Sequence, residues 1–199
     1  MASHLDLEEQ EQLDQLKAFW AQYGNLITWL LIAVFGTVAA WNGWQYWQRS
    51  QADKAAIMYD EVERAAQAGD MAKLERSAAD MKERFGSTAF AAQAASLAAK
   101  GFYDAGKPDL AKKELTWVSE NASDPGFKAT AKLRLAGLLM DTKAFDEALQ
   151  VLGGEFPAEY AGLVADRRGD VYLAQGKRDQ AKTEFEKAYG RLPTLYAAQ

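Results

Sequence analysis

The chain has 199 residues and a formal net charge of −5, with 23 Lys and Arg against 28 Asp and Glu. It contains no basic run, and nucleic-acid binding needs clustered cations that displace counterions from the phosphates; nucleic acid is therefore excluded as a partner. Cysteine is absent, which excludes disulfides and thiolate chemistry but is compatible with either redox compartment.

Residues 1–23 are expected to form a short acidic head with helical character. Met1 to Lys17 carries five acidic residues and one lysine. Leu13, Leu16 and Trp20 fall on one helical face, as in a short amphipathic helix.

Residues 24–48 are predicted to form a single transmembrane helix. No charged residue or histidine lies between Lys17 and Arg49, and about 20 apolar residues are enough to cross the bilayer core. A cleaved signal peptide fits poorly, because it needs a basic start and a shorter apolar core. A buried core helix is hard to accommodate in a chain of this size. Aromatic side chains, which favour the headgroup region, bracket the run at Trp20, Tyr23, Trp29, Trp41, Trp44, Tyr46 and Trp47.

One face of this predicted helix carries only small residues, at steps of three, four and three. In lipid, close helix packing depends on small side chains at the contact, so this face is a candidate for packing against another membrane helix. The alternative is the ordinary enrichment of Gly and Ala in membrane spans. The face consists of Ala33, Gly36, Ala40 and Gly43.

The orientation of the span is ambiguous from charge alone. Lys17 precedes it, whereas Arg49 and Lys54 follow it. The positive-inside rule taken literally favours a cytoplasmic C-terminal part, but the difference is a single residue. Since no Pro or Gly lies between Gln45 and Gln67, the helix is expected to continue beyond the membrane without a linker.

Residues 49–199 are predicted to form an all-α solenoid of tetratricopeptide type. Four turn sequences stand in equivalent places, 37, 37 and 33 residues apart: QAGDMAKL (67–74), DAGKPDLA (104–111), DTKAFDEA (141–148) and AQGKRDQA (174–181). A period of about 34 residues with a glycine turn is typical of this repeat, in which each unit is a pair of antiparallel helices. Small Gly169 and Ala181 are expected to let the last two helices approach closely. Segments 84–89 and 119–128 are expected to be loops between units.

A solenoid of this kind has a concave surface lined by the first helix of each unit. We expect this surface to be a groove that binds a partner protein. In the tetratricopeptide register the inner positions are Gln93, Ser96, Lys100 and Tyr103, then Leu133, Gly137 and Met140, then Asp166, Asp170 and Leu173.

No catalytic or cofactor site is expected. The only histidine is His4, and without a second His or any Cys the usual zinc arrangements are excluded. Asp166 and Asp170 are four residues apart on one predicted helix, but acid–base catalysis would require burial in a cleft. A solvated face or groove wall is the better interpretation of this pair.

Together, the acidic head, the Trp-rich span WLLIAVFGTVAAWNGWQYWQ, its continuation QADKAAIMYDEV and the helical repeats resemble the YfgM-type ancillary subunits of the bacterial Sec translocon. The resemblance covers nearly the whole chain and is most specific in the span and its continuation. It implies a tetratricopeptide-like membrane protein and not an enzyme.

The resemblance also implies a location and partners. The protein would be a single-pass protein of the inner membrane, with a cytoplasmic N-terminus and periplasmic repeats, because large domains translocate despite a weak charge bias. Its partners would be Sec translocon subunits, a membrane-anchored periplasmic isomerase-like chaperone and secretory client proteins. It would act as a protein–protein interaction scaffold that helps to pass secreted proteins to periplasmic chaperones. The alternative is a tethered assembly factor for another envelope or division complex.

Overall fold

The computed structural model describes residues 7–196, and side chains are described for residues 11–190. The all-α prediction is confirmed, since no strand occurs in this described part of the chain. His4 and the first six residues of the expected head lie outside it. The elements are α1 (Leu7–Gln67), α2 (Met71–Phe85), α3 (Ala89–Asp104), α4 (Pro108–Asn121), α5 (Pro125–Asp141), α6 (Phe145–Leu152), the 3₁₀ helix η1 (Ala158–Tyr160), α7 (Ala161–Ala174) and α8 (Arg178–Tyr196).

Two compact units divide the chain after Ser50. The boundary falls inside α1, which is helical from Leu7 to Gln67 without a break. This continuity is what the absence of Pro and Gly after Gln45 predicts.

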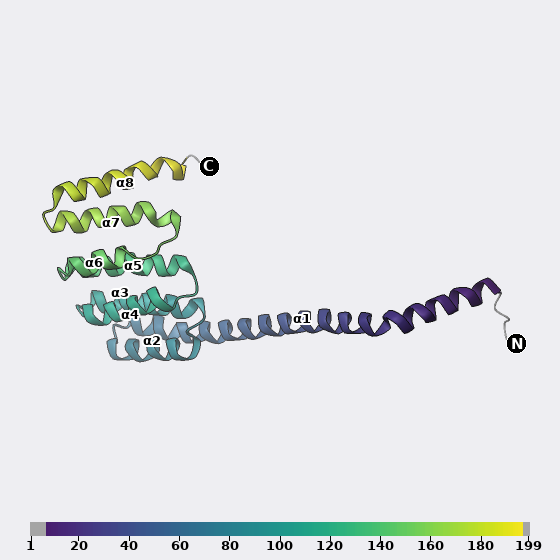
Figure 1. Ribbon diagram of the computed structural model, residues 1–199. Helices are drawn as coiled ribbons and strands as arrows, with labels where there is room; N and C mark the ends of the chain where they lie inside the picture. Colours follow the sequence, from purple (N-terminus) through teal and green to yellow (C-terminus); the bar gives the residue numbers. More distant parts are fainter. Residues whose placement is uncertain (1–6, 197–199) are drawn as a thin grey trace. The chain divides into compact units, whose positions relative to one another are not determined.

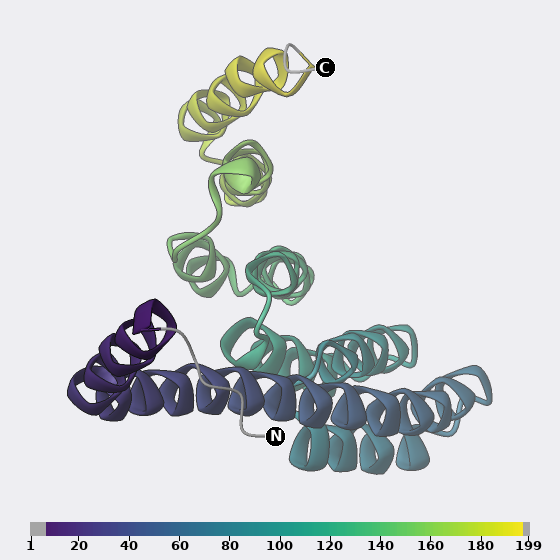
Figure 2. The ribbon, with the colours of Figure 1, turned by 90° about the vertical axis from the view of Figure 1, so that its right-hand side faces the viewer.

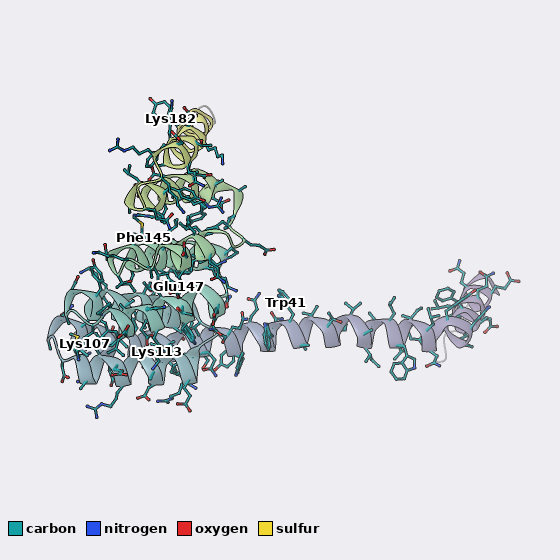
Figure 3. All side chains as sticks on the ribbon, turned by 60° about the vertical axis from the view of Figure 1, so that its left-hand side comes forward. Trp41, Lys107, Lys113, Phe145, Glu147 and Lys182 are labelled. Atoms are coloured by element: carbon teal, nitrogen blue, oxygen red, sulfur yellow. The ribbon has the colours of Figure 1, made fainter. Side chains whose placement is uncertain are left out.

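The N-terminal unit is helical and almost wholly exposed. Leu30, Phe35 and Trp41 are 60%, 65% and 64% exposed, and the Trp41 ring stands away from the helix (Figure 3). Gly24 is the one buried residue among positions 11–50, because the Trp20 indole covers it. Among the described residues, α1 is the one helix that is long and apolar enough to cross a membrane.

The C-terminal unit, from Gln51 onward, is a stack of helix pairs. Figure 1 shows α2 to α8 lying one pair after another, and Figure 2 shows α5 and α6 nearly end-on and side by side. Its core is rich in alanine, which lets helices approach closely. Among the side chains of this unit, the largest that are fully buried are Phe102, Leu74, Met81, Leu139, Leu152, Val62, Val118 and Val171.

The four predicted turns share one backbone geometry. The second residue after each first helix has a positive φ: Gly69 (66°), Gly106 (68°), Lys143 (61°) and Gly176 (77°). At each turn the next N–H donates to a carbonyl five residues back, as from Lys107 to Phe102 (2.8 Å). This is the Schellman ending, which satisfies carbonyls left free at a helix C-terminus.

The segments between units are shorter than the sequence indicates. Residues 119–128 are expected to be a loop, yet α4 runs to Asn121 and α5 begins at Pro125. Proline suits the first position of a helix, where its missing N–H would have no partner. The Asp124 carboxylate caps α5 by accepting from the N–H groups of Gly126 (2.7 Å) and Phe127 (3.0 Å).

A buried ion pair joins α2 to α4, the second helices of two successive repeats. Lys82 Nζ lies 2.6 Å from both carboxylate oxygens of Glu114, and the two side chains are only 13% and 4% exposed. The Lys82 ammonium also lies 5.8 Å from the centre of the Trp117 ring. Lys82 therefore provides the charge that a carboxylate needs in so buried a place.

Candidate functional site: a groove along α3 and α5

A cavity of about 560 Å³ opens between α3, α4 and α5. It lies on the first helices of two successive repeats, as expected for the concave surface of a solenoid. Most of its wall is apolar, and charged groups stand among the lining residues. The lining consists of Ser96, Leu97, Ala99, Lys100, Tyr103, Ala111, Leu115, Arg134, Gly137, Leu138 and Asp141.

Two polar contacts organise one part of this lining. The Tyr103 hydroxyl donates to Asp141 Oδ2 at 2.6 Å, which links α3 to α5. Lys100 Nζ lies 2.5 Å from Asp104 Oδ2, one turn further along α3. The hydrogen bond to Asp141, followed by the charge of that carboxylate, raises the pKa of Tyr103 above its usual value. Tyr103 is therefore held as a neutral donor.

A second, more polar hollow of about 540 Å³ adjoins the cavity. The two share Ser96 and Arg134, so they lie next to each other along α3 and α5, and together they are called the groove. Among the walls of the hollow, the Tyr59 ring packs on that of Phe90, with centroids 6.0 Å apart. The hollow is lined by Tyr59, Gln93, Ser96, Asp124, Gly126, Phe127, Thr130, Arg134 and Tyr160.

Asp166 and Asp170 lie on α7 and do not line the cavity or the hollow. Asp170 is half-buried, and burial is the main reason why its pKa lies above the usual value; the charge of Asp166 adds to this and that of Arg167 opposes it. Arg167 Nη1 lies 3.4 Å from Asp170 Oδ2. Within the described residues, no group of three His, Cys, Asp or Glu side chains is placed to hold a metal ion.

Some of the predicted groove residues line the groove in the structure, and others pack against the core. Those on α3, namely Gln93, Lys100 and Tyr103, line the hollow or the cavity. On α5, Leu133 and Met140 are half-buried and pack against the core instead. Which of these residues touch a partner stays a prediction.

Arg134 and Asp141 take the places on α5 that the sequence assigned to Leu133 and Met140. A shift of one residue turns a helix by about 100°, which moves an apolar stripe from the groove to the core. The apolar side chains of Leu133 and Met140 were the sequence signal that these two residues pack in the core. Gly137 lines the cavity, at a position predicted to face the groove.

The small-residue face of the span is exposed within the N-terminal unit. At Gly36 and Gly43 an added Cβ would meet nothing within 4 Å. Ala33 and Ala40 are exposed too, although the Ala33 carbonyl accepts a hydrogen bond from Thr37 Oγ1 at 2.7 Å. Packing of this face against another membrane helix stays a prediction.

Comparison with known proteins connects the span and the repeats to one family. A family model described as a tetratricopeptide repeat-like domain matches residues 17–196. An ancillary SecYEG translocon subunit of Neisseria gonorrhoeae is 31% identical over 197 residues, which is 97% of this chain and 92% of the relative. The chain belongs to the family of ancillary SecYEG translocon subunits.

Other ancillary SecYEG translocon subunits are similar over most of the chain as well. That of Escherichia coli is 30% identical over 89% of this chain and 85% of its own length. That of Haemophilus influenzae is 29% identical over 92% of this chain and 89% of its own length. The tetratricopeptide-like fold predicted from the repeat spacing is thereby confirmed.

Proposed function

We propose that this protein is a membrane-anchored scaffold of the Sec translocon. The observation that carries the proposal is the extent of the similarity, which includes the apolar helix as well as the repeats of proteins named ancillary SecYEG translocon subunits. A scaffold of this kind works by binding, and the groove along α3 and α5 supplies a concave binding surface.

In this proposal the chain has three parts. Residues 1–23 are a cytoplasmic head, residues 24–48 cross the inner membrane, and residues 49–199 lie in the periplasm. The exposed apolar side chains of α1 support the span, since a bilayer is the environment in which such a helix is stable.

The proposed partners follow from this arrangement. The face of Ala33, Gly36, Ala40 and Gly43 packs against a membrane helix of the translocon, because small residues allow close approach in lipid. The groove takes polypeptide segments of secreted proteins or of a membrane-anchored isomerase-like chaperone. The protein thereby helps to pass secreted proteins to periplasmic chaperones.

Quantitative co-purification from a mild detergent tests the proposal. The unsubstituted chain is expected to recover translocon subunits, and Gly36→Leu with Gly43→Leu is expected to reduce that recovery severalfold. Val34→Leu with Val38→Leu is the matched control, since it adds bulk on the opposite helical face and should leave recovery unchanged. If the unsubstituted chain recovers another envelope or division complex and no translocon subunit, the protein is an assembly factor and the proposal is wrong.

A catalytic role is tested separately with Asp166→Asn and Asp170→Asn together. A scaffold is expected to retain its cellular function with both carboxyl groups replaced. Loss of a measurable turnover in the double variant would contradict the scaffold proposal.

A further inference from the structure

Gly137 differs from Gly101 and Gly169, which also lie inside helices of the repeats. At Gly101 an added Cβ would come within 2.9 Å of Leu74 Cδ2, and at Gly169 it would overlap the Phe185 ring. Close packing explains why both positions are glycine. At Gly137 an added Cβ would meet nothing within 4 Å, although glycine inside a helix is less stable than alanine.

The space beside Gly137 is the cavity between α3, α4 and α5. A side chain at position 137 would project into it, because no other atom of the chain stands in the way. The glycine therefore keeps open a space that the fold itself does not need. A volume of about 560 Å³ is ample for one large apolar side chain.

Among the charged residues that line the groove, Arg134 differs from the others in its pairing. Lys100 is paired with Asp104, Asp141 accepts from Tyr103, and Asp124 caps α5. Arg134 is exposed, and no ion pair or side-chain hydrogen bond involves its guanidinium within residues 11–190. It lines both the cavity and the hollow, so it stands where the two meet.

We propose that the groove binds an extended polypeptide segment, with a large apolar side chain in the cavity and a neighbouring carboxylate paired with Arg134. This inference rests on the proposed scaffold function and names the segment that its groove takes. A polypeptide suits the site better than a lipid acyl chain, because the hollow offers the polar side chains of Gln93, Ser96 and Thr130 to backbone amides.

The test measures binding of short fluorescent peptides to the full chain in nanodiscs by fluorescence anisotropy. The parent peptide is acetyl-Ser-Ala-Glu-Phe-Ala-Ser-amide, and two others replace its Glu by Lys or its Phe by Ala. We expect the parent to bind best. Loss of the Phe ring should weaken binding about tenfold, in the range of one buried apolar side chain.

Gly137→Leu places an apolar side chain in the cavity, where it competes with that of the peptide, and is expected to weaken binding of the parent peptide by about tenfold or more. The matched control is Gly190→Leu, because an added Cβ at Gly190 of α8 also meets nothing within 4 Å and this residue lies outside the groove. The control should bind within twofold of the unsubstituted chain. Thermal unfolding should show that both variants are folded.

Arg134→Glu tests the charge without filling the cavity. Since Arg134 is exposed, this variant should fold, and it should prefer the Lys peptide to the Glu peptide. Unchanged preference in Arg134→Glu, or undiminished binding to Gly137→Leu, would overturn the proposal. So would binding of dodecanoate, measured by titration calorimetry, without any peptide binding, which would assign the cavity to an acyl chain. Failure here leaves translocon co-purification unaffected, so the two proposals can fail separately.

Discussion

Both units of the chain are helical, but their large apolar side chains are buried in the repeats and exposed in the N-terminal unit. In the repeats, Phe102 and Leu74 are wholly buried, and the contacts that stabilise each helix come from the same unit. In the N-terminal unit, Phe35 and Leu26 are 65% and 67% exposed on a helix that is equally regular. The repeats hence carry their own stability, whereas the apolar side chains of the N-terminal unit are not buried by other described residues, as the proposed span of residues 24–48 requires.

The same substitution in the two units should give the largest contrast. Phe102→Ala is expected to lower the free energy of unfolding of the repeats by about 3–5 kcal/mol, because it leaves a cavity in the core. Phe35→Ala should leave that quantity unchanged. Urea unfolding of the full chain in micelles, monitored by hydrogen exchange of the repeat amides, measures the free energy of unfolding in both variants. Equal losses would mean that the span contributes to the fold of the repeats.

Charge provides a second contrast, within the repeats. Lys82→Met leaves Glu114 buried without its partner and should lower the free energy of unfolding by about 3 kcal/mol. The double variant with Glu114→Met should recover most of this loss. Lys112 and Glu147 are also 2.6 Å apart but 41% and 45% exposed, so Lys112→Met should lose less than about 1 kcal/mol. Similar losses in the two lysine variants would show that burial of the first pair has no energetic consequence.

The turns between paired helices allow a smaller test of how the repeats are stabilised. Gly106→Ala places a side chain at a positive φ and should destabilise the repeats by about 1 kcal/mol. Lys143→Gly removes the same strain from the one such turn without glycine and should stabilise them by less than about 1 kcal/mol. Chemical unfolding measures both changes, and a loss of stability in Lys143→Gly would contradict this explanation.

The smallest expected effect concerns Asp170. A carboxyl whose pKa is raised by folding binds its proton more tightly in the folded state, so its charge opposes folding as the pH rises through the folded pKa. At pH 7, Asp170→Asn should therefore stabilise the repeats slightly, by less than about 0.5 kcal/mol because the site is partly exposed. This gain in stability should vanish at a pH below the ordinary pKa range of carboxyl groups. A gain that persists at low pH would exclude the carboxyl charge as its cause.

Much of the fold follows from local sequence signals. Turn spacing predicts the helix pairs, and the positive φ at Gly69, Gly106 and Gly176 confirms the turn residues. Gly169 lies against the Phe185 ring, as its small size predicts. Segment 119–128 is misjudged because Pro125 can either break a helix or begin one, and the choice depends on the Asp124 cap.

The sequence predicts where the groove lies, but it does not predict which residues of α5 line it. On α3, alanines fill the buried face, so Gln93, Lys100 and Tyr103 remain for the groove. On α5, apolar residues occur on several faces, and only the packing of neighbouring helices decides that Arg134 faces outward. The Lys82–Glu114 pair is missed for a similar reason, since it joins residues from different repeats.

The central claim is that the chain is anchored by residues 24–48 with its repeats in the periplasm, and topology tests it most directly. Because the chain lacks cysteine, single cysteines replacing Ser3 and Gln199 would be its only thiols. Intact cells are treated with a thiol reagent that reaches the periplasm but does not cross the inner membrane. The account predicts labelling at position 199 and none at position 3. Labelling at position 3 alone would place the repeats in the cytoplasm and contradict the proposed role in passing secreted proteins to periplasmic chaperones.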